Sequence, residues 1–185
     1  FNFSYNPLQW LSLNYRVGLD TYTDSRTRTA PGPTGLAEER VLEDNGLGFV
    51  NEYNSNFRAI TSTFIASANS KLGENFTATL RLGHDLYDRR RKDVGVEGSE
   101  LAVFDWFDLR NATTVVARQG ENEYRLMGIF GELTVDYKNF LYLTLTGRND
   151  TTSSLMSPNN SFFYPSASLS YVVSDHLKMP SWISN

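Results

Sequence analysis

Histidine and cysteine, the residues most often used in catalysis and metal binding, are scarce in this chain. It has no cysteine and two histidines, His84 and His176, far apart in sequence. Metal and catalytic sites need partner residues at defined spacing, and neither histidine has one. Four acids lie close together in the first quarter of the chain: Glu38, Glu39, Glu43 and Asp44. Their spacing is not that of a calcium loop. We therefore predict that the protein is not an enzyme and that it holds no metal and no cofactor.

A second set of chemically active residues consists of charges at alternate positions of strand-like segments. These are Arg16, Asp20, Arg81, Asp85, Glu132, Asp136, Arg148 and Asp150. If the strands close into a barrel, we expect these side chains to face its lumen. Opposite charges across neighbouring strands stabilise a sheet, so we favour pairing that holds the wall together. The alternative is that they line a polar path for a solute or contact a plug inside the barrel.

The segment from Phe104 to Asp108 combines three large aromatics with two acids. Phe104, Trp106 and Phe107 are costly to leave in water, and such residues are common at interfaces. They are our candidates for contact with a ligand or a partner protein. The alternative is that they fold inward against the rest of the protein. We interpret the nearby basic run, Arg89 to Lys92, as a solvated loop rather than a surface for anionic lipopolysaccharide or a partner lipoprotein.

The elements that position these residues are strands, because apolar and polar residues alternate. Leu11–Asp20 has apolar residues at every odd position, and Phe76–Asp85 has them at the even positions 76, 78, 80 and 82. This period of two is the pattern of a strand with one apolar face. Similar or weaker patterns predict five further strands: Phe1–Asn6, Asn56–Asn69, Met127–Tyr137, Leu141–Asp150 and Phe163–Val173. Phe130 is an exception, because it falls in the polar row.

The predicted connections between the strands alternate in length. Short turns are expected at Asn6–Gln9, Ser70–Glu74, Lys138–Asn139 and Ser174–Pro180. Longer loops are expected at residues 23 to 50, 88 to 123 and 151 to 161. Outer-membrane barrels have short periplasmic turns and long outer loops. Aromatics such as Trp10, Tyr137 and Phe140 lie near the short turns, as in the interfacial girdle of such barrels.

Composition limits the class of protein. The chain has 185 residues, 14% of them aromatic, and a net charge of −4, which speaks against nucleic-acid binding. No apolar run approaches the roughly 18 residues of a membrane helix. The mean hydropathy is negative, −0.39, which is compatible with a barrel because only alternate residues of its strands must be apolar. We predict an all-β fold, an antiparallel transmembrane β-barrel segment, with residues 1–185 as an internal part of one barrel domain.

The segment Tyr137–Asp150, with its sequence YKNFLYLTLTGRND, resembles a barrel signature of the SusC/RagA family of TonB-linked outer-membrane transporters of Bacteroidota. The resemblance continues through Ser153-Ser154 and the segment Asn159–Tyr171, and Gly128–Leu133 is also similar. It is strong from residue 124 onward and loose before it. The family often has Trp after the Arg-Asn-Asp step, where this chain has Thr151.

The resemblance implies a 22-stranded barrel in the bacterial outer membrane. It also implies an N-terminal plug and a TonB box, neither of which we find in this chain, and a SusD-like lipoprotein partner. The expected function is TonB-dependent import of oligosaccharides or peptides, with membrane lipid around the barrel. Two alternatives remain from other classes of protein. One is a barrel adhesin or enzyme whose loops act, and the other is a soluble carbohydrate-binding β-sandwich.

Overall fold

A computed structural model describes residues 1–31, 47–103 and 105–173. Several residues considered above lie outside the described residues: Phe104, His176 and the acids Glu38, Glu39, Glu43 and Asp44. The predicted short turn at Ser174–Pro180 also lies outside them.

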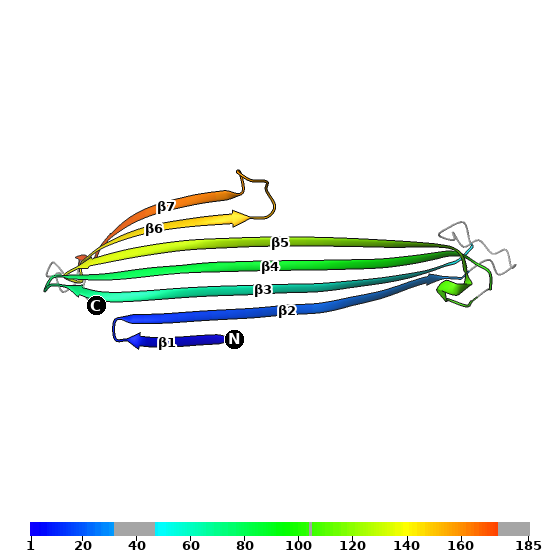
Figure 1. Ribbon diagram of the computed structural model, residues 1–185, viewed down its shortest axis with the longest axis horizontal. Helices are drawn as coiled ribbons and strands as arrows, with labels where there is room; N and C mark the ends of the chain where they lie inside the picture. Colours follow the sequence, from blue (N-terminus) through cyan, green and yellow to red (C-terminus); the bar gives the residue numbers. More distant parts are fainter. Residues whose placement is uncertain (32–46, 104, 174–185) are drawn as a thin grey trace, which may run out of the picture. The chain divides into compact units, whose positions relative to one another are not determined.

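The described chain forms strands connected in sequence order (Figure 1). Their bounds are β1 Asn2–Leu8, β2 Leu11–Ala30, β3 Phe49–Leu72, β4 Phe76–Leu101, β5 Ala112–Tyr137, β6 Leu141–Thr152 and β7 Ser161–Tyr171. A short 3-10 helix, η2, spans Leu109–Asn111. The strands form one seven-stranded sheet in the order β1 to β7, and the pairs β1–β2, β5–β6 and β6–β7 are antiparallel. The predicted all-β antiparallel fold is confirmed, and within the described residues there is one sheet rather than the two of a sandwich.

Two of the expected long loops are wrong in extent. β2 continues to Ala30, β3 begins at Phe49, β4 continues to Leu101 and β5 begins at Ala112. The loop expected at residues 88 to 123 is therefore mostly strand, and the basic run Arg89 to Lys92 lies within β4. β3, β4 and β5 have 24, 26 and 26 residues, more than twice the roughly 9–11 with which a barrel strand crosses a bilayer.

The missed halves of these strands carry polar side chains on both faces, so they lack the alternation that identifies a strand. In these halves, hydrogen bonds between polar side chains of β2 and β3 add to the backbone hydrogen bonds between the strands. The Thr23 hydroxyl donates to Asn56 Oδ1 at 2.9 Å, and the Asn54 amide donates to Ser25 Oγ at 2.9 Å. The Thr27 hydroxyl donates to the Glu52 carboxylate at 2.9 Å.

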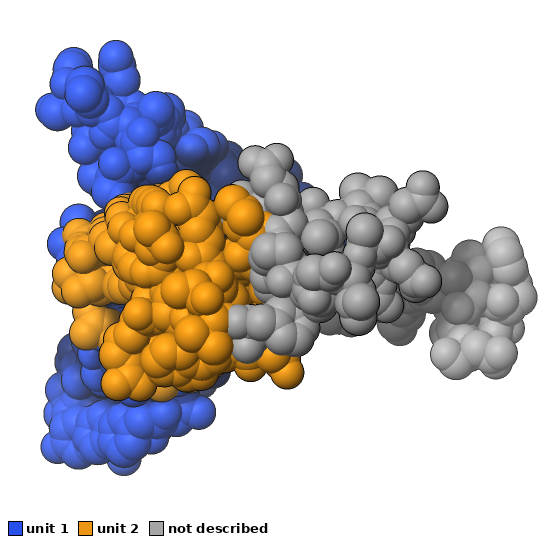
Figure 2. Space-filling view, turned by 90° about the vertical axis from the view of Figure 1, so that its right-hand side faces the viewer, with its two compact units in different colours: residues 1–19, 60–88, 124–185 blue, residues 20–59, 89–123 orange. Residues whose placement is uncertain are grey.

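The chain divides into two compact units, coloured blue and orange in Figure 2. The first, unit 1, consists of Phe1–Leu19, Ile60–Asp88 and the chain from Tyr124 onward. The second, unit 2, consists of Asp20–Ala59 and Arg89–Glu123. Unit 1 contains the strand parts with clear alternation, and unit 2 contains the strand parts that the sequence pattern missed.

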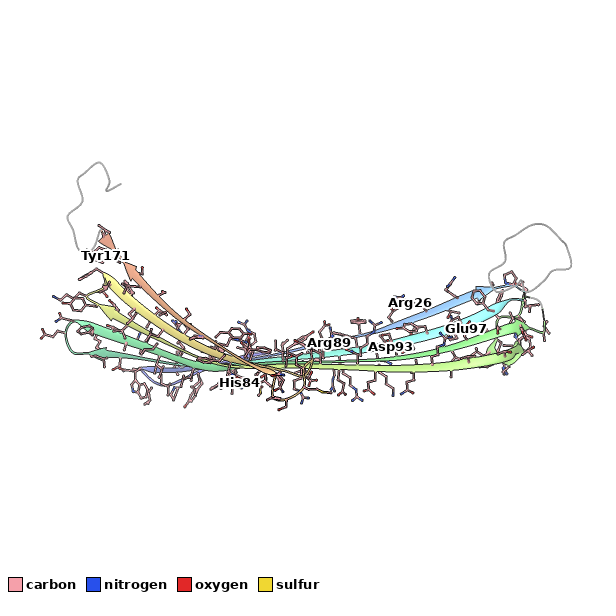
Figure 3. The ribbon with its side chains drawn as sticks, turned by 90° about the horizontal axis from the view of Figure 1, so that it is seen from above. Arg26, His84, Arg89, Asp93, Glu97 and Tyr171 are labelled. Atoms are coloured by element: carbon pink, nitrogen blue, oxygen red, sulfur yellow. The ribbon has the colours of Figure 1, made fainter. Side chains whose placement is uncertain are left out.

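In unit 1 the strand register places the predicted apolar residues in one row. Leu143 lies between Val135 of β5 and Leu169 of β7, and Leu145 lies between Leu133 and Ala167. Side chains alternate between the two faces of each strand (Figure 3). Aromatic rings gather at the short-turn ends of β4 to β7: Phe76 and Tyr137 have centroids 4.8 Å apart, Tyr137 and Phe140 5.4 Å, and Phe140 and Tyr171 5.8 Å.

Phe130, the exception to the alternation, packs against a glycine. A Cβ atom on Gly83 would lie 2.6 Å from Phe130 Cζ and 2.5 Å from the backbone oxygen of Phe64. The Arg148 guanidinium also lies 5.6 Å from the centre of the Phe130 ring. The polar row of unit 1 thus includes the Phe130 ring, which fits there because its neighbour Gly83 has no side chain.

We therefore expect Gly83→Ala to destabilise the full-length protein by about 1–3 kcal/mol, the usual cost of overpacking. The added methyl group would meet a backbone carbonyl, which cannot rotate away as a flexible side chain does. Gly120→Ala is the matched control, because nothing lies within 4 Å of a Cβ there. It should change the unfolding free energy by less than about 1 kcal/mol. Urea unfolding in lipid vesicles measures both, and equal losses would contradict the packing of Phe130 on Gly83.

The described residues include no helix that is long and apolar enough to cross a membrane.

Candidate functional site

The hairpin tip between β4 and β5, residues 102–111 of unit 2, is held by one buried amide. Asn111 is 4% exposed. Its Oδ1 accepts a hydrogen bond from the Val103 N–H at 2.8 Å, and its Nδ2 donates to the carbonyls of Val103 and Trp106, both at 2.7 Å. A side chain with three hydrogen bonds to backbone gives this connection a defined shape.

A second contact caps the tip. The Asp108 carboxylate accepts the backbone N–H of Arg110 at 2.8 Å at the start of η2, and the Arg110 guanidinium pairs with it at 2.7 Å. The hydrogen bonds from Arg110 lower the pKa of Asp108 to about 2. Asp108 therefore carries its charge throughout the physiological pH range.

This frame leaves the predicted aromatic candidates at the surface of the tip. Trp106 is 46% exposed and Phe107 is 38% exposed. Phe104, the third candidate, is outside the described residues. An exposed indole on a connection fixed by hydrogen bonds can stack on a ligand or dock a partner without a large ordering cost. Contact of Trp106 with a ligand or partner stays a prediction.

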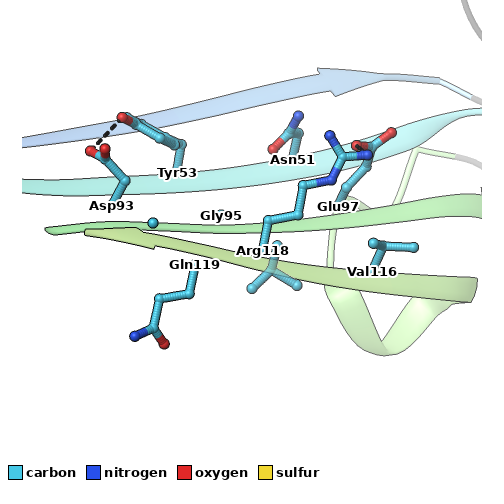
Figure 4. Close-up of a pocket in the computed structure, with 10 residues that line it drawn as sticks. Asn51, Tyr53, Asp93, Gly95, Glu97, Val116, Arg118 and Gln119 are labelled. Atoms are coloured by element: carbon cyan, nitrogen blue, oxygen red, sulfur yellow. Dashed lines mark hydrogen bonds and ion pairs between the residues drawn. The ribbon is translucent and has the colours of Figure 1, made fainter. Parts of the chain in front are cut away.

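Unit 2 also contains a hollow on β3, β4 and β5 that the sequence pattern did not indicate. We call it the β3–β5 groove, and its volume is about 380 Å³. It is lined by Asn51, Tyr53, Asp93, Gly95, Val96, Glu97, Val116, Arg118, Gln119 and Gly120 (Figure 4). This volume is within the range of ligand pockets in proteins.

One side of the groove is a hydrogen-bonded cluster. The Tyr53 hydroxyl donates to Asp93 at 2.7 Å, and Arg91 Nε donates to the same carboxylate at 3.0 Å. Arg91 also donates to the Ser55 hydroxyl at 3.1 Å, and Ser55 is almost fully buried. Hydrogen bonds from Ser55, Tyr53 and Arg91 lower the pKa of Asp93 to about 2. The cluster therefore holds an ionised carboxylate beside the groove, paired with the Arg91 guanidinium.

The other side presents charges of both signs. Arg118 Nη2 lies 4.0 Å from Glu97 Oε2, at the outer limit of an ion pair, and the Arg118 side chain is 79% exposed. In Figure 4 the Arg118 side chain extends toward Glu97. Nothing lies within 4 Å of a Cβ added at Gly120, and one at Gly95 would be 3.7 Å from the Tyr53 ring. The glycines leave backbone open to a ligand.

Sequence signals for the groove existed but were obscured. The lining residues of β3 and β4 are spaced two apart: Asn51 and Tyr53, and Asp93, Gly95 and Glu97. The residues between them are also mostly polar, so the sequence shows no alternation of polar and apolar residues there. Gly95 was expected in an outer loop and lies in β4 instead. Which residues of neighbouring strands lie side by side depends on register, which a single strand's sequence does not contain.

In unit 1, the structure brings five of the eight predicted lumen-row charges into ion pairs. Arg148 of β6 pairs with Asp150 at 2.7 Å and with Asp85 of β4 at 2.9 Å. It reaches Asp85 across β5 at Gly128, where a Cβ would collide with the Arg148 guanidinium. Arg81 pairs with Glu132. The pair of Arg81 and Glu132 joins neighbouring strands, as the wall-pairing interpretation expects, whereas the pairs of Arg148 lie within β6 and across β5. The orientation of these side chains toward a lumen stays a prediction.

The other three lumen-row residues have different surroundings. Arg16 Nε donates to the Asn2 side chain at 3.1 Å, a neutral partner. Asp136 accepts the backbone N–H of Asn139 at 2.7 Å and so stabilises the short turn between β5 and β6. Asp20, in unit 2, forms no ion pair with another described residue.

The basic run of β4 was wrongly interpreted as a solvated loop. Arg90 pairs with Glu121 and, at 3.2 Å, with Glu123 of β5. Arg91 belongs to the cluster beside the groove, and Arg89 donates to Asn122 Oδ1 at 3.4 Å. Acids on the neighbouring strand explain why consecutive cations are tolerated here. His84 lies in β4, with its ring 6.1 Å from that of Phe64. Within the described ranges, no three His, Cys, Asp or Glu side chains are grouped to hold a metal ion.

No family model matches the chain, and no curated protein matches it. Solved structures do match. A structure of the RagAB peptide transporter aligns with a TM-score of 0.83 and 17% identity over 96% of this chain and 20% of that chain. The RagAB peptide importer in its "closed-closed" state gives a TM-score of 0.80 and 16% identity over 94% of this chain and 19% of that chain. The same importer in its "open-open" state gives a TM-score of 0.78 and 17% identity over 96% of this chain and 19% of that chain.

At these identities the likeness concerns the fold. The chain spans about a fifth of the length of the proteins it matches. It therefore has the fold of one part of a β-barrel transporter.

Proposed function

We propose that this chain is part of the barrel wall of a TonB-dependent importer of the SusC/RagA family in the bacterial outer membrane. The observation that carries the proposal is the match of 96% of the chain to the RagAB peptide transporter at a TM-score of 0.83. The signature-like segment Tyr137–Tyr171 supports the family assignment. The importer works with a SusD-like lipoprotein, takes its energy from TonB and performs no covalent chemistry.

The proposed substrates are peptides or oligosaccharides, and the β3–β5 groove favours peptides. A peptide carries both ammonium and carboxylate groups, which complement Glu97 and Arg118. A neutral oligosaccharide would give these two charges no charged partner. The open backbone at Gly95 and Gly120 lets an extended chain approach the strands closely.

The test is uptake by cells that lack the native gene and carry the full-length protein. A fluorescent peptide mixture should be imported better than maltoheptaose, and import should stop when TonB is inactivated. Arg118→Gln should lower peptide uptake about fivefold, the effect of losing about 1 kcal/mol from an exposed charge pair. Arg26→Gln removes another exposed arginine with an acidic partner, Asp24, and should leave uptake unchanged.

Three results would count against these proposals. Peptide uptake that continues without functional TonB would contradict the proposal that the protein is a TonB-dependent importer. Normal uptake by Arg118→Gln would remove the groove as a substrate contact. Preferential uptake of maltoheptaose would show that the substrates are oligosaccharides rather than peptides.

Membrane sidedness can be tested separately by cysteine labelling in a cysteine-free full-length protein. Ser157 lies in the connection between β6 and β7, and Asn139 lies in the short turn between β5 and β6. Long loops face outward in outer-membrane barrels and short turns face the periplasm. Ser157→Cys should therefore react with an impermeant maleimide on intact cells. Asn139→Cys should react only after the outer membrane is opened, and the opposite result would invert the topology.

A further inference from the structure

β5 has β4 on one side and β6 on the other, but β6 is much the shorter strand. The pairing of β5 with β6 ends at Leu126, and the chain after β6 turns back through residues 153–160 to β7. From residue 124 back to Ala112, no described strand pairs with the side of β5 that faces away from β4. We call residues 117–123 of this stretch, in unit 2, the open β5 edge.

The unpaired backbone groups of the open β5 edge belong to alternate residues. In an antiparallel strand, the N–H and C=O of one residue point to one neighbour and those of the next residue point to the other. The Arg125 carbonyl accepts the Ser153 N–H at 2.9 Å, and the Arg125 N–H donates to the Ser153 hydroxyl at 2.8 Å, so Arg125 points away from β4. Four residues of the edge therefore direct their groups to the same side: Glu123, Glu121, Gln119 and Ala117.

Side-chain contacts show that the alternation is unbroken along this edge. Glu121 and Glu123 both pair with Arg90 of β4, so they share a face. Arg118 and Gln119 extend to opposite sides of the strand in Figure 4. Every residue from 113 to 123 is exposed. The open β5 edge is thus a regular strand edge that no described residue covers.

An open strand edge is a template for pairing with another extended chain, and proteins usually block such an edge with charges or proline. The open β5 edge contains no proline. Its acids, Glu121 and Glu123, are held by Arg90 of the neighbouring strand and so do not stand against an incoming chain. On the opposite face, Arg118 and Gly120 of the same stretch line the β3–β5 groove.

We propose that the transported peptide binds as an added strand along the open β5 edge. This inference rests on the proposed import of peptides and states how the substrate is held. The backbone groups of the peptide bond those of the four edge residues, and every second side chain of the peptide lies on the face of the β3–β5 groove. In strand addition, backbone hydrogen bonds give affinity and the pockets for alternate side chains give specificity.

The first experiment measures binding of a fluorescent peptide of alternating alanine and serine to the purified full-length protein. An added strand presents the N–H of every second residue to the edge. A peptide N-methylated at every alanine keeps its serine N–H groups on one side and should bind as the unmodified peptide does. The same number of N-methyl groups on consecutive residues blocks both sides and should weaken binding about fivefold or more. Equal binding of the two methylated peptides would overturn strand addition, while peptide uptake by cells tests the proposed function separately.

Ala117→Pro removes one N–H from the open β5 edge and no hydrogen bond to β4, which is why proline is tolerated in edge strands. It should weaken binding of the unmodified peptide about fivefold, the effect of one lost backbone hydrogen bond. Val115→Ala is the control, because it changes an exposed side chain of β5 outside this edge and keeps every N–H. It should bind as the wild type does, and wild-type binding by Ala117→Pro would overturn the proposal.

Hydrogen–deuterium exchange of the full-length protein shows whether the edge is open. Without peptide, the N–H groups of the four edge residues should exchange fast, and those of the residues between them, which point to β4, should exchange slowly. The alanine–serine peptide should slow the fast set. Slow exchange of both sets without peptide would show that another part of the protein covers the edge, and the proposal would then be wrong.

Discussion

Leu143→Arg is expected to destabilise the folded protein by about 2–4 kcal/mol in lipid bilayers. Leu143 lies in the middle of the apolar row of unit 1, between Val135 and Leu169 on the neighbouring strands. An arginine there would face hydrocarbon, and no acid of this row is adjacent in the register to neutralise it. The cost is largest near the bilayer midplane and falls toward the interfaces. Equilibrium unfolding in vesicles measures the change in free energy.

Thr144→Lys is the control, because Thr144 is adjacent in sequence and faces the opposite side of the strand. Its Oγ1 lies 3.2 Å from that of Thr134, so the substitution loses one hydrogen bond, worth about 1 kcal/mol. A larger loss for Thr144→Lys than for Leu143→Arg would reverse the assignment of the two faces. Leu13→Arg, opposite Tyr5 on β1, should behave like Leu143→Arg.

Trp106→Ala is expected to weaken solute uptake or association with the proposed lipoprotein partner by about 2 kcal/mol or more, roughly thirtyfold. The indole is half exposed, while Asn111 holds the backbone beneath it. A large aromatic on a preorganised connection contributes strongly to binding, because little conformational entropy is lost on association. Substrate-dependent growth and co-purification of the lipoprotein, at matched expression, measure the effect.

Val103→Ala is the control for Trp106→Ala, because Val103 is an exposed apolar residue of the same connection. Its backbone binds Asn111, so truncation of the side chain leaves that contact intact. Wild-type growth and co-purification for Trp106→Ala would show that the ring packs within the protein rather than against a ligand or partner.

The sequence by itself determined the fold class, the number of described strands and the two faces of unit 1. Alternation is a local property, and a strand with one apolar and one polar face displays it directly. Leu143, Leu145 and their neighbours could therefore be assigned to one row from the order of residues alone. The charges of the polar row could be identified in the same way, since Arg81 and Arg148 occupy the alternate positions.

Only the tertiary structure decided how far β2 to β5 extend and what their far halves contain. Those halves have polar side chains on both faces, so their stability comes from hydrogen bonds to adjacent strands rather than from an apolar pattern. The partners of Arg148, the packing of Phe130 on Gly83 and the β3–β5 groove all depend on cross-strand register. Register depends on both strands of a pair, so the sequence of one strand does not predict that Tyr53 lies beside Asp93.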